Sequence, residues 1–238
     1  MSKPSGRSLL LLALLFALAV MSLTPPHMTV AQTADAQSKV QQLKAAMARN
    51  QQMLAQYTWQ MEQTIAVNGD VKSSELFQEV MGPNGQPAKV PLTATPSPSG
   101  RRFGIRHRMT EDYEAYGKQI AALAQSYAQP SPGRLQQLYA QGNVSVKSGG
   151  GPGLVSIVAT NFVKSGDSVT FTFNQTQKAL LGVNIATYNS APSDTVTMNV
   201  SFARLPDGTS HVASATINGQ SKNMVITQTN MNYSKKAT

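Results

Sequence analysis

The spacing of apolar residues changes along the chain and separates helical from extended segments. From Ser38 to about Tyr57 the apolar residues recur every three, four or seven positions, so they share one stripe of an amphipathic helix. That stripe consists of Val40, Leu43, Met47, Leu54 and Tyr57. After Tyr57 the period becomes two, which is typical of a half-buried strand. The pattern therefore predicts a leading helix followed by strands.

A β-hairpin is predicted directly after this helix. The apolar side chains of its first strand share one face: Trp59, Met61, Ile65 and Val67. Asn68-Gly69 then indicates a tight turn, because both residues tolerate positive φ. We expect the return strand over roughly residues 71–80 and a short strand near residues 88–92.

Two helices are predicted in the middle of the chain. A loop rich in Pro, Ser and Thr spans residues 93–100, and we expect a helix to open at Asp112 and to end at Pro130. Its apolar stripe is Tyr113, Tyr116, Ile120, Leu123 and Tyr127. A shorter helix is expected to start at Ser131-Pro132, because proline suits the first helical turn, and to close at Gly142.

Alternating strands and short turns fill the rest of the chain. Six strands are expected, over residues 154–163, 168–174, 181–188, 195–205, 210–217 and 223–233. Strands joined by short turns are antiparallel, and a Thr/Asn/Ser face opposite an apolar face indicates a sheet covered on one side. The predicted class is α+β: a curved antiparallel sheet, which could form a half-barrel, covered on one face by the N-terminal helix and the central helix pair.

The first residues read as a secretory signal peptide. Lys3 and Arg7 precede an apolar run over residues 9–23, which is shorter than the roughly 20 residues that span a bilayer. We expect cleavage after Ala31, with Ala36 as the second candidate and an uncleaved anchor as the alternative. The predicted organisation is a signal peptide over 1–31, a disordered mature N-terminus over 32–37 and a single domain over 38–238. The mature protein is then periplasmic or secreted, with no transmembrane span.

Composition narrows the partners and the chemistry. The chain has 20 Lys and Arg against 11 Asp and Glu, and no Cys, so it has neither a disulfide nor a lipid-modified cysteine. An exported basic protein meets anionic lipid surfaces and cell-wall polymers more often than nucleic acid. We therefore expect an anionic envelope component as a partner, and no nucleic acid, because only Phe103 interleaves the arginines.

The order of elements resembles the periplasmic lipoprotein-carrier superfamily, which also includes a sensor of envelope stress. The likeness spans residues 38–233: a leading helix, a hairpin from Tyr57-Thr58-Trp59 to Val80, a helical insertion over 112–141 and a closing meander. It implies an open half-barrel that holds helices against an apolar concave face. Gln56 to Trp59 and Leu205 to Gly208 are also similar to segments of exported bacterial proteins without an assigned function, and neither motif carries known chemistry.

The sequence offers little to an enzyme. Once His27 leaves with the signal, His107 and His211 are the remaining histidines, and the zinc-protease, nucleophile-elbow and phosphate-loop motifs are missing. His211 is read as a sheet-face histidine. We predict a non-enzymatic protein without cofactor or metal, and keep a hydrolase that uses a carboxylate pair as a lesser alternative.

Two sets of residues are candidate binding groups. An apolar ligand would contact Trp59, Met61, Ile65, Phe171, Phe173, Met198, Val200 and Phe202, whose alternative role is ordinary core. An anion would contact Arg101, Arg102, Arg106, His107 and Arg108, whose alternative is a solvated loop. The leading hypothesis is an exported protein that binds a lipid or acylated ligand between sheet and helices. The alternative is an envelope scaffold that docks a partner through a sheet edge or the basic loop.

Overall fold

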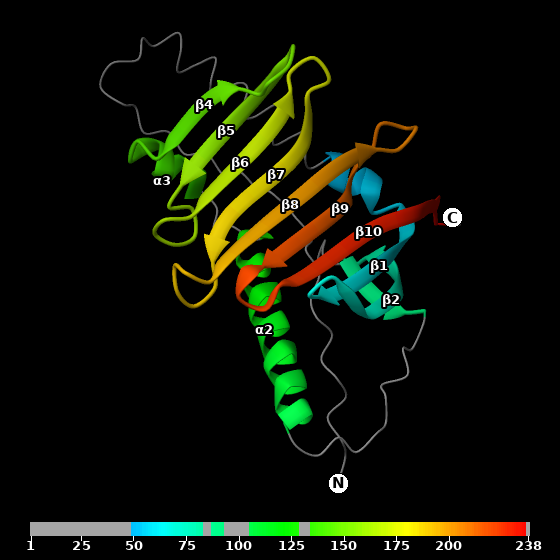
Figure 1. The fold of residues 1–238 in the computed structure, drawn as a ribbon. Coiled ribbons are helices and arrows are strands. Elements are labelled where there is room, and N and C mark those ends of the chain that lie inside the picture. Colours follow the sequence, from blue (N-terminus) through cyan, green and yellow to red (C-terminus); the bar gives the residue numbers. More distant parts are fainter. Residues whose placement is uncertain (1–48, 83–86, 93–104, 129–133, 237–238) are drawn as a thin grey trace.

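One antiparallel sheet dominates the computed structural model, which describes residues 49–82, 87–92, 105–128 and 134–236. Its strands are β1 (Tyr57–Val67), β2 (Asp70–Met81), β3 (Pro87–Pro91), β4 (Val144–Ser148), β5 (Leu154–Thr160), β6 (Ser168–Asn174), β7 (Ala179–Tyr188), β8 (Thr195–Arg204), β9 (Ser210–Gly219) and β10 (Met224–Lys235). The order β3-β2-β1-β10-β9-β8-β7-β6-β5-β4 leaves the sheet open, with β3 and β4 as its edges (Figure 1).

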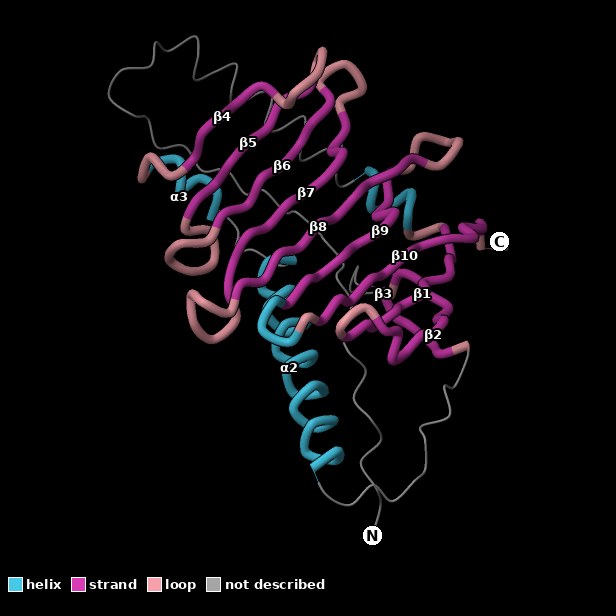
Figure 2. Tube along the Cα trace, viewed as in Figure 1, coloured by secondary structure: helices cyan, strands magenta, loops and turns pink. Residues whose placement is uncertain are grey.

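Two helices follow the first hairpin in the chain. They are α2 (Ile105–Ala128) and α3 (Arg134–Ala140), and residues 49–54 are also helical. Figure 2 shows α2 behind the sheet and extending past the turn between β9 and β10. The predicted class of curved antiparallel sheet with helices is thus confirmed. Residues 38–48, most of the predicted leading helix, lie outside the described part of the chain.

The structure corrects two predicted boundaries and adds one strand. The helix expected to open at Asp112 begins at Ile105, because no proline or glycine interrupts residues 105–112. Tyr57 opens β1 instead of closing the leading helix. The closing meander also has a seventh strand, β4, which the prediction missed because it is short and its Val146 is 66% exposed.

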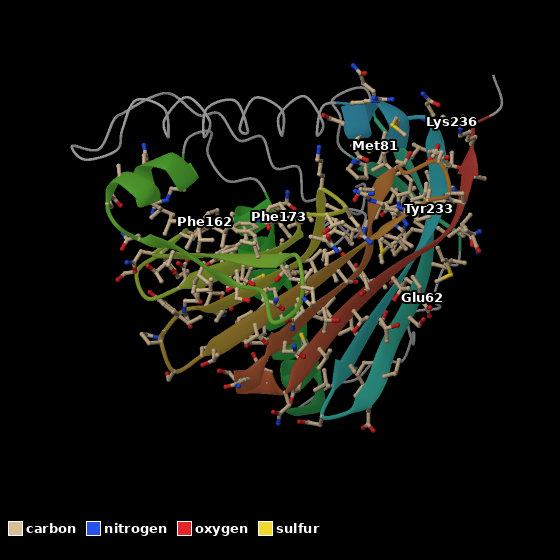
Figure 3. All side chains as sticks on the ribbon, turned by 90° about the horizontal axis from the view of Figure 1, so that it is seen from above. Glu62, Met81, Phe162, Phe173, Tyr233 and Lys236 are labelled. Carbon is tan, nitrogen blue, oxygen red and sulfur yellow. The ribbon has the colours of Figure 1, made fainter. Side chains whose placement is uncertain are left out.

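The sheet buries one face, and α2 packs on it. Along β8, buried Val196, Met198 and Val200 alternate with Thr and Asn, which gives the period of two used in the prediction. From α2, the buried residues Tyr116, Ile120, Ala124 and Tyr127 join the same apolar core. Figure 3 shows how the sheet curls, with β4 to β8 on one flank and β1, β2 and β10 on the other.

Gly219 of β9 leaves room for the Tyr116 ring of α2 to pack directly on the strand. A Cβ atom at this position would lie 2.6 Å from the hydroxyl oxygen and ring edge of Tyr116. We expect Gly219→Ala to push Tyr116 and α2 outward and to cost about 1–3 kcal/mol of unfolding free energy in urea titrations. Gly117→Ala is the matched control, because its Cβ would meet the flexible Met224 side chain at 3.4 Å and alanine favours the helix. A Gly219→Ala protein as stable as the control would contradict this packing.

Candidate functional site

The predicted apolar residues divide into two groups on the buried face. The first group lies under α2 and α3, where Phe171, Met198 and Val200 belong to the core and Ile65, Phe173 and Phe202 pack against it. These six residues therefore fill the layer between sheet and helices. Trp59 and Met61 are only 3% and 2% exposed but belong to a second group on β1.

The second group occupies the flank made by β1, β2 and β10. Trp59 pairs with Glu79 across the hairpin, and Met61 pairs with Phe77. Phe77 and Glu79 are also buried, at 4% and 2% exposed. Because paired residues point to the same face of a sheet, the Glu79 carboxyl shares an apolar surface with Trp59, Met61 and Phe77. This set, together with Tyr233 of β10, is called the flank cluster below.

Aromatic rings close the flank cluster at one side. Tyr233 stacks on Trp59, with ring centroids 5.5 Å apart. The His211 ring also contacts the Tyr233 ring, with a centroid distance of 4.2 Å. His211 of β9 is buried at 9% exposed, so it is a sheet histidine held in an aromatic contact. The helical residues 49–54 are fixed nearby, since Asn50 exchanges two hydrogen bonds with the Ser210 backbone at 2.6 and 3.0 Å.

Burial sets the ionisation of the flank cluster. It raises the pKa of Glu79 to about 7, against partial opposition from the Lys89 charge and the Trp59 N–H. Burial also lowers the pKa of Lys89, whose Nζ lies 4.3 Å from the centroid of the Phe77 ring. For Tyr233, burial and the negative charge of Glu79 raise the pKa. The site therefore favours a neutral carboxyl near neutral pH.

A charged group lies next to the flank cluster, beside Tyr57. The Tyr57 hydroxyl donates to Asp207 Oδ2 at 2.6 Å, and Lys235 Nζ lies 3.4 Å from the same oxygen. The hydrogen bonds from Tyr57 and Thr209 hold the pKa of Asp207 well below its usual range. Asp207 is therefore an ionised anchor for the ends of β1 and β10.

The other buried carboxylates fasten α2 to two turns of the sheet. Tyr116 donates to Asp194 at 2.7 Å, and Tyr127 donates to Asp167 at 2.6 Å. Burial is the main cause that raises the pKa of Tyr116 to about 12. In the described residues Asp167, Asp194 and Asp207 share no hydrogen-bond partner, so they give no support to the carboxylate pair of the hydrolase alternative.

The predicted anion site falls mostly outside the described side chains. Arg101 and Arg102 lie outside the described residues. The backbone of Arg106, His107 and Arg108 forms the first turn of α2 instead of a loop, and their side chains are likewise not described. The basic segment therefore begins a helix that projects past the sheet (Figure 1). The sheet end formed by the β1–β2 and β9–β10 turns carries a shallow depression of about 530 Å³, lined by Asn68, Gly69 and residues 218–220 and 223–225.

Sequence reasoning missed Glu79, Tyr233 and the role of His211. Two signals were present: Glu79 alternates with Phe77 along β2, and Tyr233 lies near the end of the last strand. Neither signal is decisive without the register of the hairpin, which the sequence does not show. Within the described residues, no group of three or more His, Asp or Glu could hold a metal ion.

The fold and the flank cluster define an open-sheet protein with an apolar inner face and a buried carboxyl, and solved structures with a similar layout exist. A DUF1329 family protein from Desulfovibrio piger matches with 10% identity and a TM-score of 0.39, over 80% of this chain and 90% of its own. A LolA superfamily protein from Nitrosomonas europaea matches with 8% identity and a TM-score of 0.35, over 78% of this chain and 88% of its own. A domain from Vibrio parahaemolyticus, described as a putative outer membrane lipoprotein-sorting protein domain, matches with 8% identity and a TM-score of 0.36. The match covers 80% of this chain and 91% of that domain.

These likenesses concern the layout of the elements alone. No family model and no curated protein matches the sequence. Among the described helices, none has the length and apolar character needed to cross a membrane.

Proposed function

We propose that this exported protein binds an acyl chain or a similar apolar molecule on the inner face of its sheet, at the flank cluster. The proposal rests on the observation that the buried apolar residues of that face fall into two separate groups. One part packs against α2 and α3, whereas Trp59, Met61 and Phe77 form a separate buried apolar surface. A chain laid on this surface would gain about 0.8 kcal/mol for each buried CH₂ group.

The open sheet also supports binding over catalysis. Buried Asp167 and Asp194 are engaged with tyrosines of α2. Glu79 lies among apolar side chains, where burial favours its neutral form. The protein would act outside the cytoplasm after loss of its signal peptide, and the basic first turn of α2 would meet an anionic headgroup or envelope surface.

Trp59 makes the proposal measurable, since it is the only tryptophan in the sequence. We expect a saturable change of its fluorescence when octanamide or methyl octanoate is titrated into the mature protein. Native mass spectrometry of protein from an exporting host should also show a bound lipid mass. Phe77→Leu should weaken probe binding about fivefold, roughly 1 kcal/mol, because it removes ring contacts from the proposed surface.

Phe171→Leu is the matched control for this prediction. It makes the same change at a residue of similar exposure, 3% against 4%, but beneath the helices. It should leave the probe affinity within about twofold. A protein that carries no lipid and does not respond to either probe would favour the docking alternative. The edge strand β4 would then be the surface to test, because it lacks the prolines that end β3 at Pro87 and Pro91.

A further inference from the structure

Strands β9 and β10 separate at one end of the sheet. Their ladder runs from the Gly219–Met224 pair to the Ser214–Thr229 pair. Beyond it, β9 continues beside β8 to Ser210, and β10 continues beside β1 to Lys235. Figure 2 shows the two strands diverging, and we call residues 210–213 and 230–235 the strand fork. Register shifts near this end occur in both outer ladders, β8–β9 and β1–β10.

Side chains replace the missing backbone ladder within the strand fork. The Val212 carbonyl accepts a hydrogen bond from Asn230 Nδ2 at 2.9 Å and one from the Tyr233 hydroxyl at 3.4 Å. His211 Nδ1 lies 3.0 Å from the same oxygen. Tyr233 then links the strand fork to the flank cluster, because its ring stacks on Trp59. The strand fork is thus the polar border of the proposed apolar surface.

Unpartnered polar atoms gather at this border. In the described residues, five buried side-chain atoms lack a hydrogen-bond partner, and one of them, on Gln125, belongs to α2. The other four are Trp59 Nε1, Glu79 Oε1, Asn230 Oδ1 and Thr209 Oγ1. The Trp59 N–H lies close enough to the Glu79 carboxyl to lower its pKa, but the two groups do not form a complete hydrogen bond. Trp59, Glu79 and Thr209 are 3%, 2% and 0% exposed. Because a buried polar group without a partner is destabilising, their concentration at one place points to a group that satisfies them.

We propose that the border between the strand fork and the flank cluster binds the carboxamide group of an acylated ligand. The inference rests on the proposed function and adds the chemistry of the ligand's polar end. The Trp59 N–H is a donor that matches the amide carbonyl, whereas Glu79 Oε1 and Asn230 Oδ1 are acceptors that match amide N–H groups. An ester or an alkane chain end offers no N–H and would leave both acceptors unpaired. The amide therefore distinguishes this site from a purely apolar surface.

The test compares octanamide with methyl octanoate by calorimetry on the mature protein. Both probes have the same acyl chain, but only the amide donates hydrogen bonds. We expect octanamide to bind about tenfold more tightly, which corresponds to about 1.4 kcal/mol. Glu79→Met removes an acceptor that only the amide N–H can use, so it should reduce octanamide affinity to the level of the ester. Trp59→Phe removes a donor that the carbonyl of either probe can use, so it should weaken the binding of both probes.

Glu62→Gln is the matched control, because Glu62 lies on the opposite, polar face of β1, where it accepts a hydrogen bond from Ser74. Circular dichroism would establish that each variant is folded. Equal binding of the two probes to the wild type would overturn the amide site and leave the proposed function in place. An amide preference that survives Glu79→Met would remove the site from the strand fork. Binding of neither probe to the folded wild type would overturn the proposed function itself.

Discussion

Glu79→Gln is expected to stabilise the protein by about 3 kcal/mol above pH 7 and to flatten its stability profile between pH 4.5 and 7. Burial raises the pKa of Glu79 from 4.5 in the unfolded chain to about 7 in the folded protein. Between these values the folded protein keeps a proton that the unfolded chain has released. The free energy of unfolding therefore falls as the pH rises through this window, by about 1.4 kcal/mol per pH unit.

The groups around Glu79 set the size of this effect. Lys89 on β3 favours the charged carboxylate, and so does the Trp59 N–H, but burial is the larger influence. At lower pH the opposite trend begins, because the pKa of Asp207 is depressed and stability is lost as that carboxylate is protonated. The wild type should thus be most stable at about pH 4–5.

Urea unfolding at a series of pH values would measure this prediction. Fluorescence of Trp59 in the folded state gives a second readout, with an expected midpoint near pH 7 that Glu79→Gln abolishes. Glu62→Gln on the opposite face of β1 should change the stability by less than about 0.5 kcal/mol at every pH. If the wild type and Glu79→Gln have parallel profiles from pH 4.5 to 7, Glu79 does not ionise as described.

Asp167→Ala should destabilise the protein by about 4 kcal/mol, because Asp167 accepts hydrogen bonds from several groups at once. Backbone N–H groups of Val163 and Lys164 donate to it at 2.8 and 2.9 Å, and the Phe162 N–H also donates. The Tyr127 hydroxyl adds a fourth bond at 2.6 Å and ties α2 to the turn before β6. Alanine would leave the three backbone donors without this acceptor, whereas the Tyr127 hydroxyl would keep Thr187 Oγ1 at 2.7 Å.

Tyr127→Phe tests the hydrogen bond that holds α2 separately from the backbone hydrogen bonds that hold the turn. It removes the bonds to Asp167 and Thr187 but leaves the three backbone donors paired, so it should cost only about 1–2 kcal/mol. Denaturant midpoints of both single variants and of the double variant would measure the coupling between the two residues. If Tyr127→Phe were as damaging as Asp167→Ala, the backbone donors would contribute little, contrary to the geometry.

The local elements were predictable because their signals are local. The Asn68-Gly69 turn has the expected positive φ at both residues, 54° and 84°. Alternation in β6 and β8 follows from backbone geometry alone, and it located both strands with the apolar face correctly assigned. By contrast β4 was missed, because as an exposed edge strand it buries too little apolar surface to leave a clear pattern.

The position of Glu79 could not be predicted in the same way. A two-residue turn continued without irregularity would pair Trp59 with Gln78 and place Glu79 on the polar face. The observed register shifts between Ile65 and Ala66, so Trp59 pairs with Glu79 instead. A one-residue shift moves every later side chain of β2 to the other face of the sheet. No local pattern in β2 marks that bulge.

The sequence by itself determined the alternation of the strands, the Asn-Gly hairpin, the two central helices and the α+β class, because each depends on neighbours a few positions apart. The signal peptide and the anion-binding arginines remain predictions from that same source. Only the tertiary structure decided the division of the apolar face, the burial of Glu79 beside Trp59 and the strand fork between β9 and β10. These features depend on strand register and on contacts between residues 20 to more than 170 positions apart, which short-range patterns do not encode.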